Sequence, residues 1–227
     1  MRELINHTVT IDYVHNYKID EIKEGGMSYV LLLSKVNNQN ENPLTKALYK
    51  NRVLQDRYSL LYRDYLAAKI VKETTLLPDF ERECSIWLGF SEKGIVPLLK
   101  VANIKESILA LMPRYTCSLR KIILDNLHKP SEILRLLYVS VESLHNIYKK
   151  SGIIHQDIKP ENFLIMQEGK DISIFLSDWG IANIQAKLIP QDVKELSEIA
   201  ISTMGGIGTM PYMAPERFKS YISNVRA

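Results

Sequence analysis

The segment HQDIKPEN, at residues 155–162, carries the densest set of side chains that could do chemistry. Asp157 and Asn162 lie within it, and Asp178 follows 16 residues after Asn162 in the sequence SDWG. Phosphoryl transfer from a nucleoside triphosphate needs a carboxylate that accepts the proton of the attacking hydroxyl, and oxygen ligands that hold Mg²⁺ against the phosphates. Asp157 suits the first role. Asn162 and Asp178 suit the second, because a hairpin between them would bring both to one site. Lys159 could neutralise charge on the transferring group.

The sequence on either side of this segment predicts the elements that would position it. Residues 131–150 keep an apolar face at helical spacing, with Ser131 as the cap at the start and Gly152 just past the end. Two short strands, at residues 163–166 and 172–176, follow and are joined by a Glu-Gly-Lys turn. We therefore expect the reactive segment to lie between a long helix and a hairpin.

The first third of the chain predicts strands. A run at residues 17–22 leads into Gly25 and Gly26, and an apolar run at residues 28–36 follows, which predicts a hairpin. Another apolar run, at residues 65–71, carries one lysine at its centre.

From Pro78 the pattern becomes helical, with Asp79 as its expected cap. Residues 95–101 and 107–112 then predict two more strands. Strands at the front, followed by helices and one hairpin at the back, indicate an α+β protein in two lobes.

Composition excludes several classes of protein. The 227 residues include 29 Lys and Arg against 26 Asp and Glu, so the net charge of +3 argues against a nucleic-acid partner. The longest apolar runs are about five residues, short of the ~20 that span a bilayer, so no membrane partner is expected. Cys84 and Cys117 are too few for a disulfide framework, and the five histidines show no zinc spacing. We expect a reduced, cytoplasmic protein.

The segments HQDIKPEN, SDWG and GTMPYMAPE together resemble the catalytic loop, the metal-binding motif and the end of the activation segment of protein kinases. This resemblance implies ATP- and Mg²⁺-dependent phosphorylation of serine or threonine in protein substrates. Asp157 would be the base, with Lys159 beside it, and Asn162 and Asp178 would be the metal ligands. Lys159 together with Thr209 resembles the serine/threonine-specific branch of the family.

The resemblance extends to the predicted nucleotide side of the site. The sequence AAK, from Ala67 to Lys69, resembles the family's A-x-K motif, whose lysine holds the α- and β-phosphates. Its ion-pair partner is expected on the next helix. Glu83 is preferred over Glu81 because Trp87 then falls one turn later, where the family places an apolar residue. The alternative for Lys69 is a side chain that only reaches out to solvent.

Two further parts of a nucleotide site are expected from the resemblance. The sequence IKEGGMSYV aligns with the family's glycine-rich loop through Gly25 and Gly26, and its other glycines are replaced. An ordinary hairpin turn is the alternative. Met112 would guard the adenine pocket, or it is a simple core methionine, and residues 113–115, ending at Tyr115, would form the hinge between the lobes.

The resemblance also predicts the domain organisation. Residues 1–112 would form the N-lobe, with an insertion at about residues 37–60, and residues 113–227 would form a partial C-lobe. The family places several more helices after the Ala-Pro-Glu at residues 214–216. We expect a longer protein or a second chain to supply them, and a minimal variant without them is the third possibility.

Two other functions remain open at this stage. One is a catalytically weak or inactive kinase-like module, a pseudokinase, that binds a partner; the replaced glycines favour it and the intact Lys69, Asp157 and Asp178 oppose it. The other is a phosphotransferase that acts on small molecules.

The sequence also bears on how activity would be regulated. Gln156 stands where many kinases carry an arginine, so activation would not depend strictly on a phosphate in the activation segment. The helix-like residues 192–201 could restrict access to the cleft.

Overall fold

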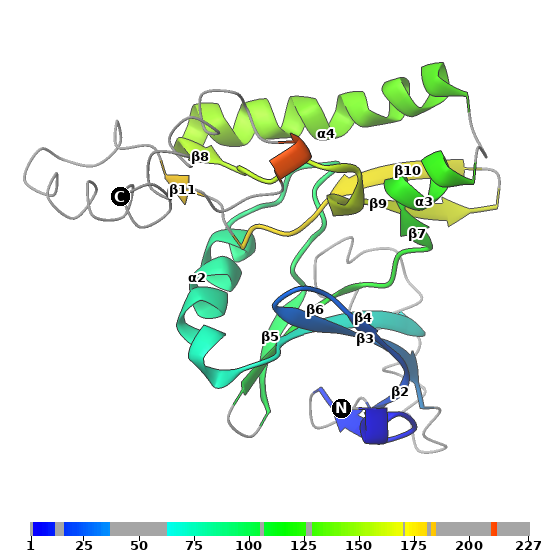
Figure 1. Ribbon diagram of the computed structural model, residues 1–227, viewed down its shortest axis with the longest axis vertical. Coiled ribbons are helices and arrows are strands. Elements are labelled where there is room, and N and C mark those ends of the chain that lie inside the picture. Colours follow the sequence, from blue (N-terminus) through cyan, green and yellow to red (C-terminus); the bar gives the residue numbers. More distant parts are fainter. Residues whose placement is uncertain are drawn as a thin grey trace, which may run out of the picture. The chain divides into compact units, whose positions relative to one another are not determined.

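The computed structural model divides into two compact units, which are described separately (Figure 1). The first unit comprises Met1–Phe90 and Val96–Tyr115, and the second comprises Ser91–Ile95 and Thr116–Ala227. Within these, the structure describes residues 2–11, 16–36, 63–104, 107–125, 129–169, 171–180, 183–184 and 210–212. Strands dominate the first unit and helices are prominent in the second, so the fold is α+β as predicted.

An antiparallel six-stranded sheet with the order β1-β2-β3-β4-β6-β5 forms the first unit. Its strands are β1 (Thr8–Thr10), β2 (Asn16–Glu24), β3 (Ser28–Lys35), β4 (Tyr65–Val71), β5 (Lys100–Ile104) and β6 (Ser107–Pro113). The predicted hairpin at Gly25 and Gly26 is confirmed, since β2 pairs with β3 across that turn. The predicted insertion at residues 37–60 lies outside the described residues.

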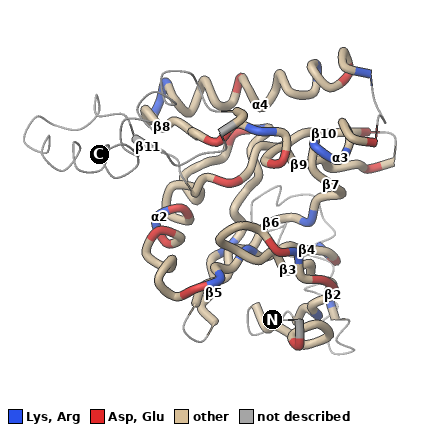
Figure 2. The backbone as a smooth tube through the Cα atoms, viewed as in Figure 1, with Lys and Arg blue, Asp and Glu red and all other residues tan. Residues whose placement is uncertain are grey.

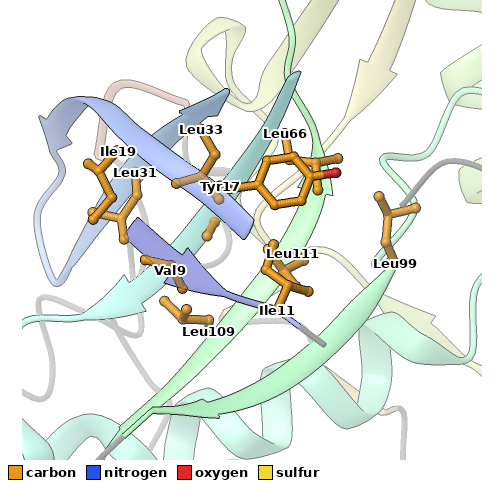
Figure 3. Close-up of a cluster of buried hydrophobic side chains, with 11 residues drawn as sticks. Val9, Ile11, Tyr17, Ile19, Leu31, Leu33, Leu66, Leu99, Leu109 and Leu111 are labelled. Carbon is orange, nitrogen blue, oxygen red and sulfur yellow. The ribbon is translucent and has the colours of Figure 1, made fainter. Parts of the chain in front are cut away.

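A core cluster of buried apolar side chains lies on this sheet (Figure 3). Val9 and Ile11, from the N-terminal segment, join Leu109 and Leu111 of β6 in the cluster. β1 pairs with β2 at one edge of the sheet, whereas the Ile11 carbonyl accepts a hydrogen bond of 3.0 Å from Lys100 Nζ on β5, at the other edge. The N-terminal segment thus connects the two edges of the sheet, which the sequence patterns did not predict.

The strand predicted at residues 95–101 is wrong over most of its length, because β5 begins only at Lys100. The preceding apolar residues are nevertheless buried, with Val96 at 0% and Leu99 at 3% exposure. The Leu99 N–H donates to the Leu111 carbonyl at 2.7 Å and so finds a partner outside a regular strand. A short apolar run indicates burial, and it does not distinguish a strand from a packed loop.

Helix α2 (Leu77–Leu88) packs against β6 in the same unit. The predicted cap at Asp79 is wrong: the helix begins two residues earlier, and Pro78 occupies its first turn. Proline is well suited to that position because its φ is already helical and its missing N–H would have no partner there. Asp79 lies within the first turn, where its negative charge is favourable.

The second unit holds a three-stranded sheet, a two-stranded sheet and two α-helices among its described residues. Its elements are β7 (Cys117–Ser118), α3 (Leu119–Leu124), α4 (Pro130–Ser151), β8 (Ile153–Ile154), a 3₁₀ helix (Pro160–Asn162), β9 (Phe163–Glu168), β10 (Asp171–Leu176), β11 (Asn183–Ile184) and a 3₁₀ turn (Met210–Tyr212). The predicted hairpin is confirmed, because β9 and β10 are antiparallel partners.

Helix α4 also begins earlier than predicted. Pro130 is its first residue and Lys129 precedes it as the cap, so the capping role predicted for Ser131 is wrong. The Lys129 N–H donates to the Glu132 carboxylate at 3.3 Å, which supports the start of the helix in place of a serine. Gly152 ends the helix as predicted, with a φ of 67° that favours glycine.

Ile147 of α4 is buried, but a large part of the apolar face of the helix is exposed. Leu134, Val141 and Tyr148 are 68%, 55% and 40% exposed, whereas Ser140 and Ser143 are buried. The Ser140 hydroxyl donates to the Gly94 carbonyl at 2.9 Å, and Ser143 donates to the Lys93 carbonyl. Two serines therefore let α4 approach the backbone of the segment Ser91–Ile95 closely.

Charges of both signs are interspersed along the described chain (Figure 2). None of the helices in the described ranges combines the length and the hydropathy needed to cross a membrane.

Candidate active site

Lys69 of β4 and Glu83 of α2 form a buried ion pair in the first unit. Lys69 Nζ lies 2.7 Å from Glu83 Oε1 and 3.0 Å from Oε2, and the two side chains are 14% and 5% exposed. Glu81 is exposed, so the acid that pairs with Lys69 is Glu83. Pairing of β4 with β3 and β6 fixes the Lys69 backbone, and the burial of α2 fixes Glu83.

A second contact to Lys69 was not anticipated from the sequence. Lys69 Nζ lies 5.7 Å from the centre of the Phe80 ring, within the range of a cation–π interaction. Phe80 precedes Glu83 by three residues, so both side chains lie on the same face of α2. An aromatic residue three positions before the pairing acid was the signal available in the sequence.

The thiol of Cys84 is predicted to resist alkylation. Its burial, and then the Glu83 carboxylate, raise the pKa from 9.0 to about 12. The thiolate is the reactive form, so only about one thiol in 10⁴ is ionised at a pH of about 8. We expect iodoacetamide to label Cys84 at least ~100-fold more slowly in the folded protein than in denaturant, as measured by peptide mass spectrometry. Equal labelling rates in the folded protein and in denaturant would contradict the protection of Cys84 by burial.

The other residues predicted on the nucleotide side lie in the same unit. Ala67 of β4 pairs directly with Met112 of β6, and both side chains are buried. Tyr115 follows β6, and burial raises the pKa of its hydroxyl well above the usual value. Gly25 and Gly26 form the exposed β2–β3 turn, where the Gly25 N–H donates to the Ser28 carbonyl at 2.9 Å. Met112 can therefore be the guard of an adenine pocket or a simple core methionine. The Gly25–Gly26 turn can likewise be the counterpart of the glycine-rich loop or an ordinary hairpin turn.

Asp157, Lys159 and Asn162 come together in the second unit, on the loop after α4 and the 3₁₀ helix that follows. Lys159 Nζ lies 2.6 Å from Asp157 Oδ2. Asn162 Nδ2 donates to the same Oδ2 at 3.1 Å and to the Asp157 backbone carbonyl at 2.8 Å. Two donors, Lys159 Nζ and Asn162 Nδ2, thus hold the Asp157 carboxylate.

Asp178 is tied to this loop through its neighbour Ser177. The Ser177 N–H and hydroxyl both donate to the backbone carbonyl of Asn162, each at 2.8 Å. Asp178 itself has a φ of +69° and Gln156 a φ of +68°. Such left-handed backbone is uncommon outside glycine and is found at functional sites. The β9–β10 hairpin therefore returns the chain to the predicted base and metal-ligand residues, as the sequence suggested.

His155 is a buried, neutral histidine that joins these two segments. Its Nε2 lies 3.0 Å from the Ser177 carbonyl, its Nδ1 accepts the Asp157 N–H at 3.3 Å, and its ring lies 4.6 Å from that of Trp179. Donation from Nε2 and acceptance at Nδ1 are compatible in a single neutral tautomer. Burial is the largest cause of its lowered pKa, while the Ser177 hydrogen bond and the Asp178 charge partly oppose the shift.

His155 is therefore predicted to make stability fall in acid. The unfolded chain binds a proton at this residue below a pH of about 6.5, whereas the folded chain, in which burial lowers the pKa of His155, binds it only at a lower pH. The free energy of unfolding should then decrease as the pH falls from about 6.5 to 5.5, by up to about 1 kcal/mol from this residue. In urea unfolding at several pH values, the free energy of unfolding of His155→Gln should depend less steeply on pH than that of the wild type. Parallel profiles for the two proteins would refute the assignment.

The structure thus brings together Asp157, Lys159 and Asn162, with Asp178 alongside, in one unit and Lys69 with Glu83 in the other. Convergence of the two groups on one pocket stays a prediction. Thr209, the helix-like residues 192–201 and the Ala-Pro-Glu at 214–216 lie outside the described residues.

Comparison with known proteins gives matches in both compact units. The family model of the protein kinase domain matches residues 58–225. A probable serine/threonine-protein kinase of Clostridium perfringens is 26% identical over 71% of this chain and 23% of its own length. A protein of Mycoplasma genitalium named as a serine/threonine-protein kinase is 25% identical over 93% of this chain and 56% of its own length.

A shorter match, 40% identical over 37% of this chain, is to a dual specificity protein kinase of Danio rerio and covers 7% of that protein. The chain therefore spans between 7% and 56% of the lengths of these relatives. Because the family match runs through both compact units and covers about three quarters of the sequence, the chain belongs to the protein kinase domain family.

Proposed function

We propose that the chain transfers the γ-phosphoryl group of ATP to serine or threonine side chains of proteins, with Mg²⁺ as the metal ion. The observation that carries the proposal is the assembly of Asp157, Lys159 and Asn162, in which two donors hold one carboxylate in place. A preformed base matters for this reaction because catalysis depends on positioning and on charge rather than on covalent chemistry by the protein.

Asp157 accepts the proton of the substrate hydroxyl as that oxygen attacks the γ-phosphorus and the bond to the β–γ bridging oxygen breaks. Lys159, whose ammonium contacts Asp157, offsets negative charge on the phosphoryl group. Lys69, held by Glu83, binds the α- and β-phosphates. The predicted N-lobe of residues 1–112, with an insertion at about 37–60, and the partial C-lobe of residues 113–227 remain part of this proposal, although the compact units assign Ser91–Ile95 to the second unit and residues 113–115 to the first.

The donor set in the second unit suits Mg²⁺, which prefers carboxylate and carbonyl oxygens. The side-chain nitrogen of Asn162 donates to Asp157, and the side-chain oxygen of the same amide would be the ligand to the metal. The Asp178 carboxylate, on left-handed backbone, would be the second protein ligand. When bound, Mg²⁺ neutralises the phosphate charge that builds up during transfer.

One observation favours a second candidate, a kinase-like module that binds a partner without transferring phosphate. In the exposed β2–β3 turn, Gly25 matches the second of the three glycines of the kinase loop, and Lys23 and Ser28 stand where the first and third would be, so a loop of this sequence should cover phosphates less well. Its backbone N–H groups can still contact phosphate from such a turn.

Radiolabelled ATP, Mg²⁺ and a generic basic protein separate these candidates. We expect labelled phosphoserine or phosphothreonine in the basic protein, and none when Mg²⁺ is replaced by a chelator. Binding of Mg²⁺–ATP without any transfer would favour the binding module and overturn the proposal. Label that appears in added small alcohols and never in protein would instead indicate a small-molecule phosphotransferase.

A further inference from the structure

Lys72, the residue that follows β4, contacts residues on both sides of the β2–β3 turn. Residues 25–27 form this turn, directly after Glu24 at the end of β2. The Lys72 N–H donates to the Met27 carbonyl at 3.0 Å, and Lys72 Nζ lies 2.6 Å from Glu24 Oε1. The same ammonium lies over the Tyr29 ring of β3, 5.2 Å from its centre. Through these three contacts, one residue connects β2, the turn and β3 to the end of β4.

Strand register places these contacts on one face of the sheet, in which β2, β3 and β4 are neighbours (Figure 1). Glu24 pairs with Tyr29, and Tyr29 pairs with Ile70 of β4, so their side chains share a face. Ile70 packs against the core cluster. Lys69 lies on the opposite face, because successive side chains alternate along a strand. Lys72 therefore holds the turn from the face opposite to that of Lys69.

The turn itself contributes little packing. Gly25 and Gly26 carry no side chain and are exposed, and Met27 is 61% exposed. The Gly25 N–H donates to the Ser28 carbonyl at 2.9 Å, which closes the turn on itself. Exposed backbone with few buried contacts opens at a low cost in free energy. The contacts of Lys72 add a link from this turn to β4, the strand that carries Lys69.

The ion pair between Lys72 and Glu24 is too exposed to matter much for global stability. The Lys72 side chain is 23% exposed and that of Glu24 is 66% exposed, so water and salt screen the attraction. A weak contact can still change the population of a local opening that itself costs little. Loss of the Lys72 side chain should therefore act on the turn and leave the fold intact.

We propose that Lys72 is a positioning residue for the β2–β3 turn, and that it holds the backbone N–H groups of the turn at a fixed place relative to Lys69 before a nucleotide phosphate binds. Backbone N–H groups of such a turn can bind phosphate only if they are presented together. The link to phosphate rests on the proposed function, whereas the effect of Lys72 on the turn does not.

The first test measures hydrogen exchange of the Gly25 N–H by nuclear magnetic resonance in the full chain, which needs no enzymatic activity. Lys72→Met keeps a long side chain and removes the charge, and Glu24→Gln removes the charge of its partner. We expect the protection factor of the Gly25 N–H to fall about twofold to fivefold in each variant, the range that an exposed ion pair can supply. The temperature of thermal unfolding should hardly change.

Lys18→Met is the matched control, because it makes the same chemical change at an exposed position of β2, away from the turn. It should leave the Gly25 protection factor unchanged. An unchanged protection factor in Lys72→Met overturns the proposal, and so does an equal loss in Lys18→Met. If Lys72→Met fails to fold, Glu24→Gln, at a more exposed position, decides in its place.

The second test uses the phosphotransfer assay. Lys72→Met should raise KM for Mg²⁺–ATP about twofold to fivefold and leave kcat within about twofold of the wild type, since the turn contacts the nucleotide and not the attacking hydroxyl. Lys18→Met removes the same positive charge and should change neither quantity, which separates the position of the turn from general attraction between lysines and phosphate.

An unchanged KM in Lys72→Met, or an equal rise in Lys18→Met, would overturn the role of Lys72 in phosphate binding. If the wild type neither binds Mg²⁺–ATP nor transfers phosphate, the proposed function fails, and the Gly25 protection factors alone decide whether Lys72 positions the turn.

Discussion

Replacing Asp157 with asparagine is expected to lower kcat for phosphoryl transfer by about 10²–10⁴-fold, the range found when a positioned general base is removed. The asparagine side chain has the same shape, and its carbonyl oxygen can still accept from Lys159 and Asn162. It cannot take up the proton of the substrate hydroxyl. KM for Mg²⁺–ATP should therefore change by less than about threefold, since no nucleotide contact is assigned to this residue.

Asp171→Asn makes the same chemical change at an exposed position on β10 and should leave kcat unaffected. Thermal unfolding of both variants shows whether the fold is retained. A kcat for Asp157→Asn within about tenfold of the wild type would remove Asp157 as the base and leave the binding-module alternative in its place.

Lys69→Met is expected to reduce kcat/KM by about 10²–10³-fold, the usual cost of losing one electrostatic contact to a reacting group. It should also lower the free energy of unfolding by about 3–5 kcal/mol, because the Glu83 carboxylate, 5% exposed, loses its charged partner. Phosphotransfer kinetics and urea unfolding measure the two effects separately.

Lys69→Arg distinguishes charge from geometry, since it keeps the positive charge and changes the shape of the donor group. Lys121→Met on α3, where the lysine pairs with Asp125 at the surface, is the control and should change neither quantity measurably. Full activity in Lys69→Met would show that the Lys69–Glu83 pair is purely structural.

The candidate site was largely predictable because its parts are local in the sequence. Asp157, Lys159 and Asn162 lie within six residues of one another, so their side chains can meet whatever surrounds them. Asp178 required one further step, the β9–β10 hairpin, and that was visible as two short runs joined at a Glu-Gly-Lys turn. The choice of Glu83 over Glu81 relied on helical spacing to Trp87.

Contacts between distant segments were not predictable in the same way. Helical periodicity identified the apolar stripe of α4, and it could not reveal that Ser140 would take the buried position against Gly94, since that depends on which neighbour approaches the helix. The contact of Phe80 with Lys69 likewise depends on how α2 is rotated on the sheet. The 3-residue strand β1 is too short to show a period.

The connection that the N-terminal segment makes across the sheet also affects the order of events during synthesis. Ile11 and Lys100, which it joins, are 89 residues apart, so the ribosome completes Ile11 long before its partner exists. Until β6 has emerged, the core cluster that Val9 and Ile11 enter lacks Leu109 and Leu111, so early nascent chains would leave Val9 and Ile11 incompletely covered. Expression fragments that begin after residue 11 would lack this closure and leave Leu109 and Leu111 uncovered, which makes the first eleven residues part of the minimal folding unit.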